Sequence, residues 1–290
     1  MTSIYRIAQF SLTTGAADRL ADFYERALGL RQIGLERRVG AAFETAMGVA
    51  GGASGLVLEL GEQEVELLEF ATRGRPYPQH AASSDLTFQH LAVVVADMRA
   101  AFEGLLAVGG WSAITEGGPQ RLPDASGGVT AFKFRDPDGH PLELLAFPED
   151  ASPPPWRDKS GPGPCLGIDH SAISVADAAR STAFYEALGF TVSARSHNRG
   201  PEQARLDGLP APDAEVTALS PTQATPHVEL LCYRSNAGAT RSVRLRNNDI
   251  AASRLVLEAA GAPKAGADAV RRSLFDPDGH HLLIDEPVDP

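Results

Sequence analysis

The chain has few cysteines, and its cationic residues are outnumbered by acidic ones. Both features limit the cellular compartments and binding partners that we expect. Only Cys165 and Cys232 occur among 290 residues, which is too few for a disulfide framework and indicates a reducing compartment. Lysine and arginine total 26 against 37 acidic residues, for a formal net charge of -11. An acidic surface repels nucleic acid and anionic membranes, so we expect neither as a partner.

Long apolar runs are also missing. No stretch of about eighteen apolar residues could form a membrane span, and the opening MTSIYRIAQFSL lacks the charged-then-apolar order of a signal peptide. Hydrophobic residues make up 43% of the chain and charged residues 22%, which is typical of a globular protein long enough for two domains. We therefore expect a soluble cytoplasmic protein.

The sequence does contain a repeated turn. Residues 134–148 read FRDPDGHPLELLAFP and residues 274–287 read LFDPDGHHLLIDEP. Asp and Gly close a hairpin and Pro presets one dihedral, so DPDGH is interpreted as turn chemistry rather than as a set of ligands. Glu143 stands three residues after the first histidine, and Leu283 takes the same place after the second. We therefore assign a structural role to the repeated turn and a functional role to the carboxylate of Glu143.

A helical motif repeats as well. FYERALG in the first half returns as FYEALG in the second, and apolar residues around the first copy follow helical spacing up to a capping Gly29. Fourteen residues separate Gln9 from Phe23, and fourteen separate His170 from Phe184. The two stretches therefore align without gaps from a preceding strand to the middle of the helix.

Two further units follow the same plan. We align residues 88–110 with 242–262 and expect a shorter helix in each. Each unit then reads strand, helix and about three strands, four times along the chain. The proline-rich segment 148–167 is suited to a linker. We predict one domain at 1–147, holding modules one and two, and another at 168–290, holding modules three and four.

A βαβββ unit with FYxxxLG in its helix and DPDGH before its last strand resembles the vicinal oxygen chelate superfamily. That group includes glyoxalase I, methylmalonyl-CoA epimerase, extradiol dioxygenases, fosfomycin-resistance enzymes and bleomycin-binding proteins. The resemblance implies an α+β fold in which four βαβββ modules form two cupped mixed β-sheets with flanking helices. It also implies one divalent metal ion (Zn²⁺, Ni²⁺, Co²⁺, Mn²⁺ or Fe²⁺), held by residues on the first and last strands of the modules.

Each module offers up to two positions that match this ligand pattern. They are Gln9 and Glu66 in module one, His90 and Glu143 in module two, His170 and Glu229 in module three, and Ser242 and Leu283 in module four. Leu283 cannot bind a metal, so the chain can build only one complete site.

Two ligand sets remain open, depending on how the modules pair. Pairing across the linker gives His90, Glu143, His170 and Glu229, whereas pairing of neighbours gives Gln9, Glu66, His90 and Glu143. We favour the crossed set because two imidazoles and two carboxylates suit a first-row divalent ion better than a set with a neutral amide. The polar segment NRGPEQARLDG in module three also has the character of a binding loop.

The resemblance implies a metal-dependent isomerase, epimerase or glyoxalase-like lyase that acts on a small oxygen-chelating substrate through an enediolate. Glu143 is the candidate base and Glu229 its catalytic partner. The alternatives are an extradiol-type ring-cleavage dioxygenase and a metal-free small-molecule binding or resistance protein. We expect Phe132, Phe134 and Phe147 in the walls of the cup. With four modules in one chain, a monomer or a homodimer is expected.

Overall fold

The computed structural model describes residues 3–234, 244–262 and 270–287, and its elements fall into four modules. Module one comprises β1 (Ile4–Thr13), α1 (Ala17–Leu28), β2 (Arg31–Arg38), α2 (Ala41–Met47), β3 (Ala53–Leu60) and β4 (Gln63–Phe70). Module two comprises β5 (Gln89–Val95), α3 (Met98–Val108), β6 (Ser112–Ala113), β7 (Gln120–Arg121), β8 (Thr130–Arg135) and β9 (Pro141–Ala146). Module three comprises β10 (Cys165–Ser174), α4 (Ala178–Ala187), β11 (Thr191–Arg199), α5 (Pro201–Asp207), β12 (Asp213–Ser220) and β13 (His227–Tyr233). The described part of module four comprises β14 (Ser253–Ala259), β15 (Val270–Phe275) and β16 (His281–Glu286).

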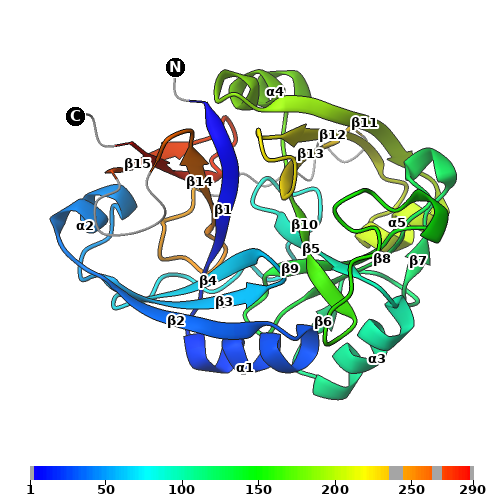
Figure 1. The fold of residues 1–290 in the computed structure, drawn as a ribbon, viewed down its shortest axis with the longest axis horizontal. Helices are drawn as coiled ribbons and strands as arrows, with labels where there is room; N and C mark the ends of the chain where they lie inside the picture. Colours follow the sequence, from blue (N-terminus) through cyan, green and yellow to red (C-terminus); the bar gives the residue numbers. More distant parts are fainter. Residues whose placement is uncertain (1–2, 235–243, 263–269, 288–290) are drawn as a thin grey trace.

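The strands form two mixed sheets that stand side by side (Figure 1). One runs β15-β16-β14-β1-β4-β3-β2, and the other runs β11-β12-β13-β10-β5-β9-β8-β6, with β7 paired to β8. Module one thus pairs with module four and module two with module three, which confirms the crossed pairing. Each sheet takes strands from both sides of the linker, and the division into two domains stays a prediction.

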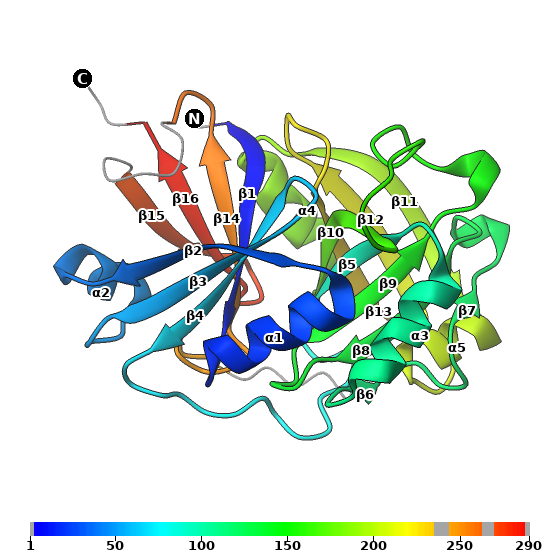
Figure 2. The ribbon, with the colours of Figure 1, turned by 60° about the horizontal axis from the view of Figure 1, so that its bottom comes forward.

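The apolar core lies between the sheets and the helices that cover them. Strand β5 shows the alternation that places side chains on two faces. Leu91, Val93 and Val95 join the main core, whereas His90 and Ala92 face the opposite side. Helices α1 and α3 lie next to each other on the core side, as both views show (Figures 1 and 2).

The alignment of residues 242–262 with 88–110 is wrong. Ser253–Ala259 forms strand β14 and not a helix, and Ser242 lies outside the described residues. Strand β14 is hydrogen-bonded between β1 and β16, so sheet pairing and burial outweigh the helical propensity of its Leu and Glu residues. The correct counterpart of His90 is Arg254, because Ser11 pairs with Arg254 as Ala172 pairs with His90.

The DPDGH turn of module two joins the halves of the molecule. The hydroxyl of Tyr24 donates to Asp136 Oδ2 at 2.7 Å, and His140 Nδ1 contacts the same oxygen at 2.8 Å. His140 Nε2 lies 3.0 Å from the backbone oxygens of both Thr13 and Ile250. The tyrosine of the repeated FY motif and the repeated turn therefore meet across modules, which gives both motifs a structural role.

Candidate metal centre

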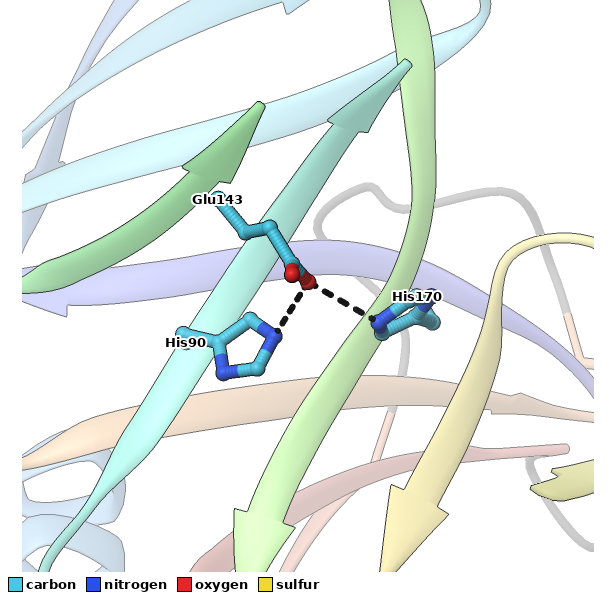
Figure 3. A group of neighbouring side chains, drawn as sticks. All are labelled: His90, Glu143 and His170. Carbon is cyan, nitrogen blue, oxygen red and sulfur yellow. Dashed lines mark hydrogen bonds and ion pairs between the residues drawn. The ribbon is translucent and has the colours of Figure 1, made fainter. Parts of the chain in front are cut away.

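Four of the predicted residues line one cavity of about 420 Å³ in the sheet of modules two and three: His90, Glu143, His170 and Glu229. The ligand atoms of His90, Glu143 and His170 all lie within 4.8 Å of one another. Figure 3 shows these three side chains pointing toward one another from neighbouring strands.

Strand register explains this convergence. Strand β5 lies antiparallel to β10 and parallel to β9, and β13 lies parallel to β10. Ala92 is paired with both His170 and Glu143, while Ala172 is paired with both His90 and Glu229. The two small alanines thus lie at the centre of the cup floor and leave room for four larger polar side chains around them.

The distances fit a single ion. Glu143 Oε2 lies 3.0 Å from His90 Nε2 and 3.8 Å from His170 Nε2, which in turn lies 3.5 Å from Glu229 Oε2. Donors that share one ion at about 2.0–2.2 Å lie about 3–4.4 Å apart. His170 Nε2 is also buried without a hydrogen-bond partner among the described residues. Such an atom is suited to the role of a metal ligand. Two imidazoles and two carboxylates therefore suit a first-row divalent ion.

Asp169, which no sequence motif marks, fixes the orientation of His170. Asp169 Oδ2 lies 2.9 Å from His170 Nδ1, and Asp169 Oδ1 accepts from the indole of Trp156 in the linker. Neighbouring strand residues normally face opposite sides, but the β10–β5 register shifts between Ile168 and His170. This irregularity turns both polar side chains toward the same region. A carboxylate behind a histidine fixes its tautomer and makes it a better ligand.

The charges of the site are strongly coupled. Burial alone would lower the pKa of His170, but Glu229 and Asp169 outweigh it and raise that pKa to about 9. Burial lowers the pKa of His90. For Glu229 burial acts the other way, and the charge of His170 overcomes it and lowers the pKa to about 2. Burial also opposes ionisation of Glu143, but the charges of Lys133 and His90 lower its pKa. Both carboxylates of the cup are therefore ionised at neutral pH, whereas His170 would have to release a proton on binding a metal ion.

The second set of candidates is separated from this cup. Gln9 and Glu66 lie on β1 and β4 of the other sheet, so the four residues of the neighbour-paired set do not converge. Gln9 Nε2 donates to Glu64 at 3.2 Å, and Glu66 accepts from Ser11 at 2.7 Å. Leu283 is fully buried in an apolar cluster.

The expected cup walls are corrected at two positions. Phe132 and Phe134 belong to the main core, where their rings make edge-to-face contacts with Trp111. Because side chains alternate along β8, Lys133 between them points into the cup instead and lines the cavity. Phe147 does line the cavity as expected.

Comparison with known proteins identifies the fold. The family model described as the Glyoxalase/Bleomycin resistance protein/Dioxygenase superfamily matches residues 6–144 and 167–284. Glyoxalase I from Zea mays superposes with a TM-score of 0.63 at 18% identity, covering 97% of this chain and 92% of that chain. A candidate dioxygenase from Bacillus subtilis gives a TM-score of 0.55 at 11% identity, covering 98% of this chain and 86% of that chain. Both structures show the shared fold.

No curated protein matches the chain. Within the described residues, none of the helices has the length and apolar character needed to cross a membrane.

Proposed function

The chain belongs to the glyoxalase/bleomycin resistance protein/dioxygenase superfamily, and we propose that it is a metal-dependent isomerase, epimerase or glyoxalase-like lyase. The proposal rests on one observation, the convergence of His90, Glu143 and His170 beside Glu229 in a single cavity. The substrate is a small carbonyl compound with a neighbouring oxygen. Two unpaired cysteines support a cytoplasmic location, and a complete cup within one chain is compatible with a monomer or a homodimer.

His90, Glu143, His170 and Glu229 would hold a divalent ion, which supplies Lewis-acid polarisation of a substrate carbonyl. The carboxylates then move a proton at the carbon beside that carbonyl. Glu229 is the freer of the two, since its side chain is 25% exposed and meets His170 and His227 only at 3.5 and 3.8 Å. Glu143 is 7% exposed and held by His90 at 3.0 Å. We assign Glu229 as the main proton carrier and Glu143 as ligand and second carrier.

The test is metal-dependent hydrogen–deuterium exchange at the carbon beside the carbonyl of hydroxyacetone, followed by proton NMR in D₂O. Wild-type protein loaded in turn with each of the five candidate ions should catalyse exchange with at least one, and Glu229→Gln should lose most of it while keeping the ion. Glu64→Gln, a carboxylate of the other sheet, is the matched control and should behave as wild type. Bound metal without exchange for any ion would contradict an isomerase or lyase.

One observation favours a second function. Two histidines and one carboxylate form the compact group of His90, Glu143 and His170, and non-haem Fe²⁺ oxygenases use this ligand type. An extradiol-type dioxygenase would consume oxygen with catechol when the protein holds Fe²⁺. Oxygen uptake with catechol that survives Glu229→Gln would favour this alternative, because only the lyase needs Glu229. If the protein binds a small molecule but no metal, it is a binding or resistance protein.

A further inference from the structure

A buried ion pair lies in the wall of the candidate metal cup. Lys133 on β8 is paired in the ladder with Glu143 and faces the same cavity. Its ammonium contacts Asp207 Oδ1 at 2.7 Å, with the two side chains only 5% and 0% exposed. Asp207 ends helix α5 of module three, so the pair connects modules two and three above the cup.

Two more side chains converge on the same carboxylate. Gln203 Nε2 donates to Asp207 Oδ2 at 2.7 Å, and the hydroxyl of Tyr233 reaches that oxygen at 3.1 Å. Since a carboxylate only accepts, the amide nitrogen of Gln203 must face Asp207 and its oxygen must point elsewhere. Gln203 is buried, lines the cavity, and its Oε1 accepts no hydrogen bond from the described residues. An unpaired buried carbonyl costs about 1–3 kcal/mol.

The other sheet shows what the same positions contain without a candidate metal site. Helices α2 and α5 are bounded by equivalent glycines of positive φ, Gly40 and Gly48 in one, Gly200 and Gly208 in the other. Counting from these glycines matches two positions of α2 with two of α5. The last residues of β4 and β13 give a third match. The strand partners of Leu283 and Glu143 give a fourth. The matched pairs are Lys133 and Ser273, Gln203 and Phe43, Asp207 and Met47, and Tyr233 and Phe70.

Three of these counterparts, Phe43, Met47 and Phe70, are apolar and pack over the second cup. Met47, Phe70, Val256 and Leu283 form one buried apolar cluster, with Phe43 packed against it. Apolar side chains are therefore sufficient to hold the short helix on the sheet. In the first cup the matched positions instead carry the hydrogen-bonded group of Lys133, Gln203, Asp207 and Tyr233. This group leaves Gln203 Oε1 without a donor among the described residues. Packing of the short helix alone therefore does not explain it.

We propose that Lys133 and Gln203 hold a hydroxyl group of the substrate, which narrows the substrate to small carbonyl compounds that carry a further hydroxyl. The proposal rests on the function proposed above. An ammonium has three N–H groups, of which Asp207 takes one, and Gln203 Oε1 offers an acceptor. A hydroxyl can accept from Lys133 and donate to Gln203 at once, whereas a carboxylate has no proton to donate and a methyl group can do neither. Asp207 and Tyr233 are positioning residues.

The test compares two metal chelators that differ by one hydroxyl, lactohydroxamic acid and propionohydroxamic acid. Their affinities for Zn²⁺-loaded protein are measured by isothermal titration calorimetry. The wild-type protein should prefer lactohydroxamic acid about tenfold, as one buried hydrogen-bonding group allows. Gln203→Leu, which keeps the size of the side chain and the Lys133–Asp207 pair, should abolish this preference and retain Zn²⁺. Gln203→Met serves if that variant does not fold.

Phe43→Leu is the matched control at the equivalent position of the other cup and should keep the wild-type preference. Equal binding of the two hydroxamates by wild type, or an unchanged ratio in the Gln203 variant, would overturn the hydroxyl site while leaving the metal centre intact. If wild-type protein takes up no metal and binds neither hydroxamate, the proposed metal-dependent function is wrong. The proposed hydroxyl site, which rests on that function, is then wrong as well.

Discussion

The two sheets are built from the same repeated module, yet the side chains in their two cups differ in charge and in metal-binding capacity. Sheet register makes the four central positions of one cup equivalent to four positions of the other. The matched pairs are His170 and Gln9, Glu229 and Glu66, His90 and Arg254, and Glu143 and Leu283. The first cup has four candidate metal ligands around a cavity, and the second has a single carboxylate, an amide, a guanidinium and a leucine.

Two arginines compensate the buried Glu66 carboxylate of the second cup without a metal ion. Arg38 Nη2 lies 3.1 Å from Glu66 Oε1, and the guanidinium of Arg254 on β14 adds a second positive charge. This fully buried guanidinium donates to Ser11 Oγ at 3.3 Å, Thr13 Oγ1 at 2.8 Å and the backbone oxygen of Asn247 at 2.9 Å. Burial lowers the pKa of Arg254 to about 10, against the charge of Glu66, so Arg254 remains charged at neutral pH. At the position where the first cup has His90, a candidate metal ligand, the second cup therefore carries a positively charged side chain.

The largest effect on folding is expected from Arg254→Ala. It removes a fully buried guanidinium with its three hydrogen bonds and leaves Glu66 with Arg38 as its remaining cation. This should cost about 3–5 kcal/mol of unfolding free energy. His90→Ala at the equivalent position should cost about 1–2 kcal/mol in metal-free protein. Urea denaturation of both metal-free variants gives the comparison. Equal losses would contradict a stabilising role for the buried charge of Arg254.

A smaller effect is expected from Asp169, which holds the candidate metal ligand His170. Asp169→Asn keeps the size of the side chain but weakens the partner of His170, so Zn²⁺ affinity should fall about 10–100-fold. Competition with a coloured chelator measures this affinity. Glu64→Gln, which removes a carboxylate charge beside Gln9, should leave the affinity unchanged. A similar fall in both variants would indicate a general charge effect rather than an oriented ligand.

The smallest expected effect is on the pH dependence of stability. It arises from His140 in the DPDGH turn of module two, which contacts both halves of the molecule. Burial opposes the charged form of His140, but Asp136 outweighs it and raises the pKa of His140. Both ring nitrogens face acceptors, so the protonated ring stabilises the fold. This contribution is complete below the ordinary histidine pKa of about 6.5 and is lost as pH rises through the folded-state pKa.

His140→Gln should therefore weaken the fall in thermal midpoint as pH rises from about 6.5 through the raised folded-state pKa of His140. His280→Gln in the second DPDGH turn is the control, because Ser174 O is the acceptor that its ring meets in the described part of the chain. Parallel pH profiles for wild type and His140→Gln would contradict a charged His140.

Sequence repetition predicted much of this architecture, because a module must stack its neighbours to bury its apolar face. It located His90, Glu143, His170 and Glu229 at matching places but left two pairings open. The donor chemistry of these four residues favoured the crossed pairing, which the sheets confirm. Their role as metal ligands stays a prediction.

Sequence could not supply the details that depend on local irregularity or distant contact. The shift in β10 that brings Asp169 beside His170 has no sequence signature, and the pair of Lys133 and Asp207 joins residues 74 positions apart. Module four was misaligned because the residues of β14 also suit a helix. That error hid Arg254, whose position is evident only from its pairing with Ser11.

Metal content is the most direct test of the difference between the cups. Wild type, His170→Ala and Gln9→Ala, purified identically and reconstituted with divalent ions, are compared by mass spectrometry of bound metal. We predict about one ion per chain in wild type and Gln9→Ala and none in His170→Ala. Loss of the ion in Gln9→Ala with retention in His170→Ala, or no ion in wild type, would contradict the assignment of the metal centre to modules two and three.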